Sequence, residues 1–368
     1  MSQVLRDISS LGTSIWLDDL SRERLVPSGS ARSLTEVIEK ESVVGVTTNP
    51  AIFSAAISQS PLYGEDIKSL FHSGADIDSI IAALTSADVT AACDSFFSCF
   101  ERSGGIDGRV SIEVDPRFAR DTKSTVEQAR ALWQSIDRPN LLIKVPATRE
   151  GLPAIRTLIS EGISVNVTII FSVSRYREVL NAYLSGLEDR LANGFTVSGI
   201  HSVASFFVSR VDTEIDARLQ KSGVAPALQG KAALANARLA YQHFISVTES
   251  QRWKELSRHG ALPQRPLWAS TGVKDSRYDP CMYVTELVAP LTVNTMPEAT
   301  LIAVRDSGKN IRESITDHFE KSNQIINELA ENGIDIEEVA ETLEREGIDK
   351  FIKPWLGLIE TVSKVARA

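Results

Sequence analysis

Eight short runs of apolar, β-favouring residues recur along the chain, and their spacing constrains the fold more than any other feature. The runs are TSIWLD, VVGVTTN, RVSIEVD, LLIKVPA, SVNVTII, SVASFFV, RPLWAST and LTVNTM. Helical patterns lie between most of them, such as residues 116–136, which begin with a proline and repeat apolar residues at helical spacing. Strands that alternate with helices are typical of parallel βαβ units. Eight units predict an α/β protein with a (β/α)₈ TIM-barrel fold, and a doubly wound open sheet is the alternative that the same alternation permits.

The length of the chain leaves room for more than a barrel. A (β/α)₈ barrel takes about 250 residues, whereas the chain has 368. We expect one long helix or a helix pair over residues 76–102, and C-terminal helices over residues 308–366 that are interrupted near Gly333 and Gly347. No low-complexity linker or internal repeat indicates a second domain. Residues 1–368 are therefore predicted to form a single barrel domain with additional N- and C-terminal helices.

The charge balance argues against two classes of partner. The chain has 39 Lys and Arg against 48 Asp and Glu, a formal net charge of -9 at pH 7. Such an acidic protein is not a general binder of nucleic acid or of acidic membranes, so an anionic ligand needs a local cationic pocket. The N-terminal segment lacks the pattern of a signal peptide, and no uncharged apolar run reaches membrane-spanning length. We expect a cytoplasmic protein with neither nucleic acid nor a membrane as partner.

Motifs for metals and redox cofactors are missing from the sequence. The five histidines are scattered, and the three cysteines match no zinc or redox spacing. The segment GGIDG at Gly104 to Gly108 precedes a strand instead of following one, so it lacks the context of a dinucleotide-binding loop. We therefore expect neither a metal nor an organic cofactor.

Several predicted strands have one apolar and one polar face. In SVNVTII, Val165, Val167 and Ile169 alternate with Asn166 and Thr168, and the runs VSIEVD and SIWLD alternate in the same way. In an antiparallel sheet the polar face would simply meet water. The intervening helices should instead cover the apolar face, so the polar face is expected to point into a barrel.

Polar side chains gather at the predicted C-terminal ends of these strands, which is the end where barrel active sites lie. The set comprises Asp18, Asn49, Glu113, Lys144, Asn166 and Thr168. Burying the ammonium of Lys144 in an apolar run is costly unless it has a partner or a chemical role. The chemistry that suits a buried lysine is Schiff-base formation with a carbonyl compound, helped by carboxylates that move protons. The alternative is that Lys144 merely pairs with Glu113 or Asp18, and spacing alone does not decide between them.

A series of motifs carries a resemblance to a known family. GVTTNPAIF, IEVDPR, LLIKVPAT, VNVTIIFS and SFFVSRVD occur in this order and resemble the motif series of the transaldolase family, from about Ile15 to at least Leu301. The late stretch LWASTGVKDSRYDPCMYVTELVAPLTVNTMPEATL resembles the longer bacterial branch of that family in particular. One such motif would be weak, but the ordered series is specific.

The resemblance implies a transaldolase of the non-oxidative pentose phosphate pathway that uses no metal and no organic cofactor. Lys144 would form a Schiff base with a ketose phosphate, sedoheptulose 7-phosphate or fructose 6-phosphate. Asp18 would deprotonate the C4 hydroxyl of the donor, and Glu113 and Thr168 would hold the water that imine formation releases. The retained dihydroxyacetone unit would pass to an aldose phosphate, glyceraldehyde 3-phosphate or erythrose 4-phosphate.

The resemblance also implies residues that bind the substrate. Asn49 and Asn166 would orient the hydroxyls of the three-carbon unit. In SFFVSR, Ser205 and Arg210 would bind the terminal phosphate and Phe207 would line the site; the alternative is a strand end followed by an exposed helix start.

The sequence departs from the family pattern where many members have a second phosphate-binding arginine. This chain has STGVKDSR there, so Lys274 is the first candidate for the second cation and Arg277 is the second candidate. Two other functions stay open. One is a Schiff-base aldolase that releases free dihydroxyacetone, and the other is a non-catalytic barrel that binds sugar phosphates. A homo-oligomer is also compatible with the sequence.

Three further residues have structural explanations. Trp16 is expected to pack in the barrel instead of stacking on a sugar. Asp115, which precedes a proline, is expected to cap the next helix. Asp19 lies one position away from the face that carries Asp18, so it is left out of the site.

Overall fold

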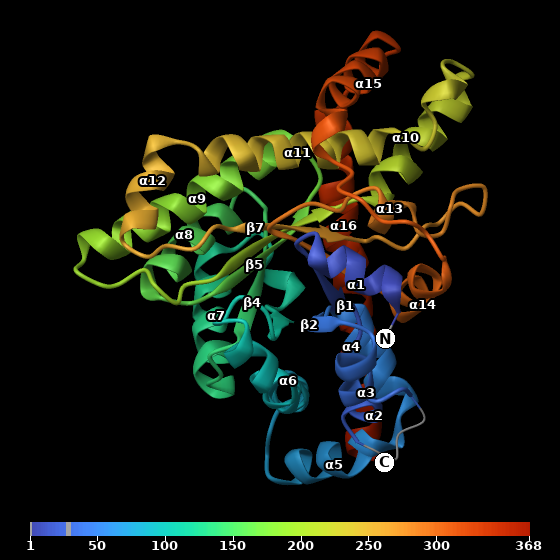
Figure 1. Ribbon diagram of the computed structural model, residues 1–368. Helices are drawn as coiled ribbons and strands as arrows, with labels where there is room; N and C mark the ends of the chain where they lie inside the picture. The colour runs from blue at the N-terminus through green and yellow to red at the C-terminus, as the bar shows by residue number, and fades with distance from the viewer. Residues whose placement is uncertain (1, 27–30) are drawn as a thin grey trace.

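The computed structural model describes residues 2–26 and 31–368. Its eight strands follow one another around a closed parallel barrel, in which β8 pairs with β1. Figure 1 shows the strands with helices around them. The strands are β1 Thr13–Leu17, β2 Val43–Thr47, β3 Arg109–Glu113, β4 Leu141–Pro146, β5 Val165–Ile170, β6 Ser202–Phe207, β7 Arg265–Ala269 and β8 Thr292–Met296. Each predicted apolar run contains one of them. The predicted TIM barrel is therefore confirmed, and the open sheet is excluded because the first and last strands are hydrogen-bonded to each other.

Helices surround the barrel and extend beyond both ends of the barrel sequence, as predicted. They are α1 Gln3–Ser10, α2 Arg22–Leu25, α3 Leu34–Lys40, α4 Pro50–Gln59, α5 Gly64–His72, α6 Ile77–Arg102, α7 Thr122–Ile136, α8 Gly151–Glu161, α9 Val173–Ala192, α10 Ser209–Ser222, α11 Ala232–Thr248, α12 Gln251–Arg258, α13 Met282–Thr285, α14 Glu298–Asp306, α15 Phe319–Glu331 and α16 Ile336–Arg367. Polar residues that precede several helices cap them; the side chains of Asp76 and Asp121 accept backbone N–H groups at the starts of α6 and α7.

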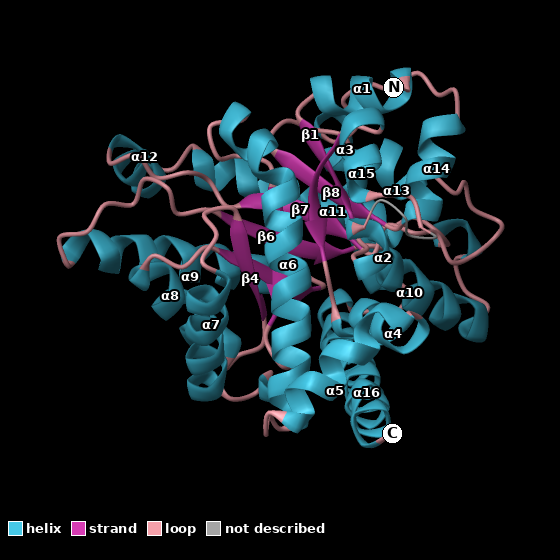
Figure 2. Cartoon of the chain, turned by 90° about the horizontal axis from the view of Figure 1, so that it is seen from below, coloured by secondary structure: helices cyan, strands magenta, loops and turns pink. Residues whose placement is uncertain are grey.

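The segment predicted as one helix or a helix pair is the single helix α6. By length and composition α6 could cross a membrane, and it is the only such helix in the described ranges. However, 50% of its most apolar stretch is buried inside the protein. It packs on β3, α5, α7 and α16, and Figure 2 shows it lying across the strands. This packing against the barrel accounts for its apolar residues.

The C-terminal helices agree with one predicted break and contradict the other. A turn at Gly333, where φ is +79°, separates α15 from α16 as expected. The break predicted near Gly347 is wrong, because Gly347 lies inside α16, a continuous helix of 32 residues. A Cβ atom at Gly347 would lie 3.6 Å from Arg210, Ile169 and Phe171. This glycine therefore marks a close approach of α16 to the end of the barrel, and tertiary packing overrides its poor helix propensity.

Two features of the barrel interior affect the site. The ring of Trp16 packs on Gly45, where a Cβ atom would lie only 2.6 Å from it, so the predicted packing role is confirmed. The alternation expected for β5 ends at Thr168, because the pairing with β6 shifts between Val167 and Ile170 and Ile169 has a φ of +55°. Such a bulge bends a strand and redirects its side chains. Ile169 accordingly approaches α16 instead of continuing the regular apolar face.

Candidate active site

Most of the predicted site residues line one cavity of about 170 Å³ at the C-terminal ends of the strands. The predicted residues in its wall are Asp18, Asn49, Lys144, Thr168, Ser205, Phe207, Arg210 and Lys274. Glu113 and Asn166 are not in the wall, but each contacts a residue that is. The sequence-predicted set is therefore brought together around a single small cavity.

Lys144 is buried beside a carboxylate. Its Nζ lies 3.5 Å from Glu113 Oε2, and both side chains are at most 7% exposed. Glu113 and Lys144 stand opposite each other in the register of β3 and β4. Nζ also donates a hydrogen bond of 2.5 Å to the carbonyl oxygen of Thr48. These contacts satisfy the ammonium, so geometry by itself is compatible with either an ion pair or a reactive amine.

Glu113 lies between the lysine and a hydroxyl. Thr168 Oγ1, on β5, is 3.4 Å from Glu113 Oε1, while Glu113 Oε2 has no hydrogen-bond partner among the described residues. Burial raises the pKa of Glu113, and the charge of Lys144 opposes this rise. A raised pKa makes the carboxyl group a better proton acceptor than an exposed glutamate, which suits a group that exchanges protons with a bound water.

Asp18 follows β1 and receives a hydrogen bond across the barrel. Thr47 Oγ1 donates to Asp18 Oδ1 at 2.6 Å, and Thr295 Oγ1 lies 2.6 Å from Thr47 Oγ1. Because Thr47 has one hydroxyl proton, Thr295 must be the donor in the second bond. Burial raises the pKa of Asp18, whereas Lys144 and the bond from Thr47 act to lower it. Asp18 therefore has the environment of a general base.

The two asparagines differ in how they reach the cavity. Asn49 caps α4, and its Oδ1 accepts a hydrogen bond of 3.0 Å from Ile52 N, so its NH₂ group is left to donate to a ligand. Asn166 is fully buried; it donates to Ser111 and its Oδ1 accepts a bond of 2.7 Å from Ser205 Oγ. Asn166 thus contacts the cavity through the hydroxyl that it orients.

Arg210 lies in the first turn of α10 with its guanidinium between two rings. Its Cζ atom is 5.2 Å from the centroid of Phe207 and 5.9 Å from that of Phe351 on α16. Its Nη1 is buried and has no hydrogen-bond partner among the described residues. Burial lowers its pKa, and nearby carboxylates, Glu346 first, oppose this effect. The alternative of an exposed helix start is therefore wrong, since a buried N–H group without an acceptor is suited to an anion.

The two candidates for a second cation occupy different places. Lys274 lines the 170 Å³ cavity and also an adjoining one of about 420 Å³. Arg277 lines neither cavity, and its Nη2 lies 2.6 Å from Asp275 Oδ2 on the surface. Of these two residues, Lys274 is the one that a ligand in the cavity could reach.

Several wall residues were missed by the sequence analysis. They are Thr47, Ala269, Ser270, Gly272, Thr295, Pro297 and Phe351. Thr47 is the last residue of β2, and Thr295 is the last but one of β8. The rule that barrel active sites lie at the C-terminal ends of strands could therefore have identified both. No sequence pattern indicated that Phe351 belongs to the wall, because its position depends on how α16 packs on the barrel.

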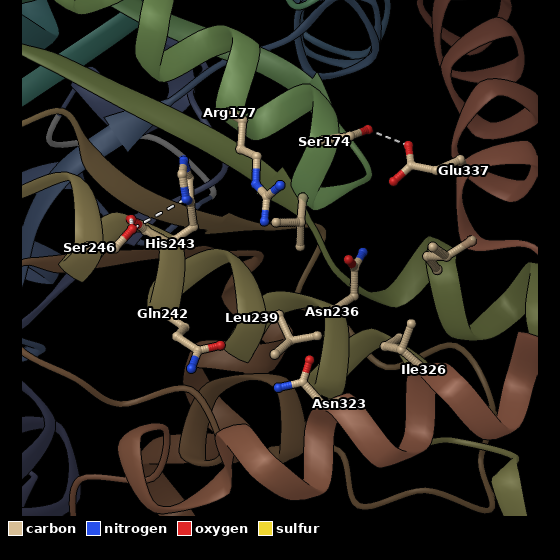
Figure 3. A pocket seen from close by; sticks show the side chains of 12 residues that line it. Ser174, Arg177, Asn236, Leu239, Gln242, His243, Ser246, Asn323, Ile326 and Glu337 are labelled. Carbon is tan, nitrogen blue, oxygen red and sulfur yellow. Dashed lines mark hydrogen bonds between the residues drawn. The ribbon is translucent and has the colours of Figure 1, made fainter.

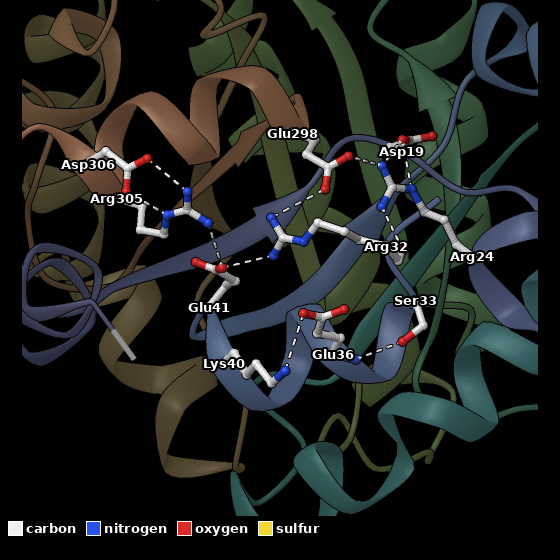
Figure 4. A network of polar contacts seen from close by, with 10 residues as sticks. All are labelled: Asp19, Arg24, Arg32, Ser33, Glu36, Lys40, Glu41, Glu298, Arg305 and Asp306. Carbon is white, nitrogen blue, oxygen red and sulfur yellow. Dashed lines mark hydrogen bonds and ion pairs between the residues drawn. The ribbon is translucent and has the colours of Figure 1, made fainter. Parts of the chain in front are cut away.

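Two charged residues near the site have structural partners. Asp19 Oδ2 lies 2.6 Å from Arg24 Nη2, and this arginine also contacts Glu298 in a network that reaches Glu41 and Arg305 (Figure 4). Asp19 is not in the wall of the cavity, as expected. Asp115 caps only the 3₁₀ turn Pro116–Phe118, through a bond of 2.8 Å from Arg117 N; the helix predicted from Pro116 onwards begins at Thr122, as α7, with Asp121 as its cap.

A larger groove, of about 500 Å³, lies between α9, α11, α15 and α16 (Figure 3). Arg177, His243 and Asn323 are among its wall residues, and Ser174 bonds to Glu337 at one edge. None of the predicted site residues lines it. Size therefore does not single out the predicted site; the small cavity is the one whose wall holds both Lys144 and Asp18, with Glu113 against the lysine.

Known proteins provide an independent comparison. Residues 15–362 match the family model described as transaldolase/fructose-6-phosphate aldolase. The chain is 55% identical over 358 residues to the transaldolase of Mycolicibacterium smegmatis, covering 97% of this chain and 95% of that protein. It is 50% identical over 366 residues to the transaldolases of Frankia alni and Thermobifida fusca, covering 99% of this chain and 98% of each relative.

Proposed function

Since the chain belongs to the transaldolase/fructose-6-phosphate aldolase family, we propose that Lys144 carries its reaction as a Schiff base with a ketose phosphate. The enzyme is a transaldolase, as are its relatives over nearly the full length. It moves a dihydroxyacetone unit from a ketose phosphate donor to an aldose phosphate acceptor. The observation that carries the mechanism is one buried amine that lies 3.5 Å from the carboxyl group of Glu113 and shares a cavity wall with Asp18, two carboxyl groups whose pKa values burial raises.

The first step joins the donor to the enzyme. The neutral amine of Lys144 attacks the C2 carbonyl, and the carbinolamine loses its hydroxyl as water to give a protonated imine. Glu113 supplies the proton for the departing water, and Thr168, 3.4 Å from its carboxyl, holds that water for the later hydrolysis. The iminium then draws electrons from the neighbouring carbon–carbon bond.

The second step breaks and remakes that bond. Asp18 takes the proton of the C4 hydroxyl, the C3–C4 bond breaks, and the aldose phosphate leaves with a new aldehyde. The electron pair of the broken bond forms a C2=C3 double bond as the C2=N pair moves to nitrogen, which gives an enamine attached to Lys144. The enamine attacks the aldehyde of the acceptor, and Asp18 returns the proton to the new hydroxyl. Hydrolysis of the imine frees the product and regenerates the amine.

Binding of the phosphate end is proposed for the outer part of the same cavity. The unpartnered Nη1 of Arg210 and the hydroxyl of Ser205 face it, and Lys274 would add the second cation. Asn49 would donate to a hydroxyl of the three-carbon unit, whereas Asn166 would act by holding Ser205. Phe207 would form the wall beneath the guanidinium.

Borohydride reduction with fructose 6-phosphate tests this proposal. A dihydroxyacetone-sized adduct, mapped by peptide mass to Lys144, is expected in the wild-type protein and not in Lys144→Ala. An adduct on another lysine, or none while the sugar phosphate binds, would contradict the mechanism. In the latter case Lys144 would be only the buried partner of Glu113, and a barrel that binds without turnover would be favoured.

Product analysis separates a transferase from an aldolase. With erythrose 4-phosphate present, a transferase converts fructose 6-phosphate to sedoheptulose 7-phosphate. Without an acceptor it accumulates the enamine, whereas an aldolase protonates the enamine and releases free dihydroxyacetone. We expect turnover to depend on the acceptor. The substrates and family also support a place in the pentose phosphate pathway of the cytoplasm, with residues 1–368 acting as one barrel domain.

A further inference from the structure

A second cavity, of about 200 Å³, lies at the opposite, amino-terminal mouth of the barrel. Arg109 and Arg265, the first residues of β3 and β7, are in its wall together with Leu142 of β4. Lys144 is two positions further along β4, towards the other end. The cavity is therefore separate from the active site, although the same strands form both.

The glycine-rich segment before β3 builds one side of this mouth. At Gly108, where φ is +74°, a Cβ atom would lie 2.4 Å from the backbone nitrogen of Phe100, so only glycine lets the loop pass so close to α6. The loop places the carbonyl oxygen of Gly105 on Arg109 and that of Ile106 on Arg265. It thus holds both guanidinium groups at the mouth.

The charges at this mouth do not balance. Arg109 and Arg265 are 2% and 8% exposed. Arg265 pairs with Asp107 at 3.0 Å, whereas Arg109 donates to the carbonyl oxygens of Gly105 and Pro139, lies with its Cζ 4.9 Å from the centroid of the Phe100 ring, and has no ion pair among the described residues. Burial and the charge of Arg265 lower the pKa of Arg109 to about 9. Asp107 opposes this decrease but already pairs with Arg265, so one carboxylate serves two buried cations, and a bound anion would offset the remaining cost.

Arg109 also keeps donors for such an anion. A guanidinium has five N–H groups, and three hydrogen bonds to the two carbonyl oxygens are found for this one. Two N–H groups remain. His201 is also in the wall, and burial lowers its pKa to about 3, so it is neutral at physiological pH.

The rest of the wall is apolar. It includes Leu142, Val203 and Leu262, and the side chains of Ile106 and Leu291 at the rim are 42% and 48% exposed. An apolar wall with two cationic groups is complementary to an anion that has an apolar body. The volume is below the roughly 300–1,000 Å³ of sites for drug-sized ligands, so the ligand is small.

We propose that the amino-terminal mouth of the barrel binds a small organic monoanion, with its carboxylate on Arg109 and Arg265 and its apolar part against Leu142 and Leu262. This site would be additional to the active site and independent of the reaction there. An inorganic anion would meet the cations but leave the apolar wall unused.

Calorimetric titration of the whole protein with benzoate tests the proposal. We expect saturable binding that persists at saturating fructose 6-phosphate, together with a rise in melting temperature. Benzamide, which has the same size but no charge, and inorganic phosphate, which has no apolar body, should bind at least about tenfold more weakly. Equal binding of benzamide, or displacement of benzoate by fructose 6-phosphate, would overturn the proposal, as would failure of benzoate to bind.

Variants at the rim provide the matched control. Ile106 is exposed, so Ile106→Asp and Ile106→Asn should both fold, and they differ from each other only in charge. The carboxylate of Ile106→Asp should weaken benzoate binding about tenfold relative to Ile106→Asn, because it repels the anion and competes for the guanidinium groups. Equal affinities of the two variants would contradict the role of the cations. Arg109→Met should abolish binding, and the rim pair decides the matter even if that core variant is unstable.

Discussion

Thr47 donates its hydroxyl proton to Asp18 at 2.6 Å, and in doing so stabilises the charged form of the proposed base. Replacement by valine removes this bond with little change in volume. The pKa of Asp18 should then rise by about one unit. Because Asp18 acts as a base only when it is deprotonated, the acidic limb of the pH profile of kcat should move to higher pH by the same amount.

Thr295→Val is the control for Thr47→Val. It removes the outer hydroxyl of the chain but leaves the bond from Thr47 to Asp18 in place. Its pH profile should shift less than that of Thr47→Val. Equal shifts of the pH profile in the two variants would mean that loss of either hydroxyl disturbs the barrel structure in general, and that the bond from Thr47 does not specifically set the pKa of Asp18.

Asp18→Asn should separate imine formation from bond cleavage. The amide keeps the shape of the side chain but cannot accept the proton of the C4 hydroxyl, so kcat should fall by about 10²–10⁴-fold. Borohydride should still trap the donor on Lys144, now as the adduct of the uncleaved sugar. Trapping that fails as completely as in Lys144→Ala would show that Asp18 serves an earlier step.

Arg210→Gln should affect the phosphate end of the substrate. Loss of the charge should raise KM for fructose 6-phosphate by about 10–100-fold, since a hydrogen bond to a charged group contributes about 1.5–3 kcal/mol. Fructose carries no phosphate and can still be cleaved between C3 and C4, so its weaker use as a donor in place of fructose 6-phosphate should change little. A parallel loss for both donors would indicate damage to the cavity as a whole.

Local sequence patterns were sufficient for the barrel and for six polar residues at the strand ends, whereas Ser205, Phe207, Arg210 and Lys274 were expected from the family resemblance alone. Apolar runs predict strands wherever both faces are buried, and the polar alternation in β5 predicts which side chains point inwards. Thr168 and Lys144 follow directly from these rules. The cavity collects them because all eight strands are parallel and end on the same side.

The features that were missed depend on packing between distant segments. Phe351 reaches Arg210 only because α16 returns over the barrel, and no periodicity within α16 shows this contact. Gly347 was expected to end a helix because glycine is a poor helix former, but the contact with the barrel determines its role. Asn166 was placed correctly on the inner face of β5. Its side chain lies behind Ser205 and outside the cavity wall, and this position depends on how the neighbouring side chains pack.

The crossing of α16 can be tested with two substitutions at Gly347. A Cβ atom there would lie in ordinary contact at 3.6 Å, so Gly347→Ala should fit and raise the free energy of unfolding by about 0.5–1 kcal/mol. Gly347→Leu should not fit, because its longer side chain would push against Arg210. It should raise KM for the phosphorylated donor while Gly347→Ala leaves KM unchanged. Chemical unfolding measures the change in stability, and steady-state kinetics measure KM. Equal KM values for Gly347→Ala and Gly347→Leu would mean that α16 lies further from Arg210 than the structure places it.

Asp212, on α10 and in the wall of the adjoining 420 Å³ cavity, predicts how stability depends on pH. Burial raises its pKa from 3.8 to about 6, although Ala233 N and the hydroxyl of Tyr283 donate to its carboxylate. Between these two values the folded chain binds more protons at Asp212 than the unfolded chain. Its contribution to the free energy of unfolding should therefore fall as the pH rises from about 4 to 6, by about 1.4 kcal/mol for each unit of pKa shift.

Asp212→Asn should remove this part of the pH dependence. The amide oxygen can still accept from Ala233 N, and the hydroxyl of Tyr283 can turn to accept from the new NH₂ group. Chemical unfolding at pH 5, 6 and 7 should show wild type losing stability relative to the variant as the pH rises. Asp349→Asn, at an exposed carboxylate of α16, should follow wild type at all three values. If Asp212→Asn also follows wild type, the carboxyl group is ionised in the folded protein throughout this range, and hydrogen bonds outweigh its burial.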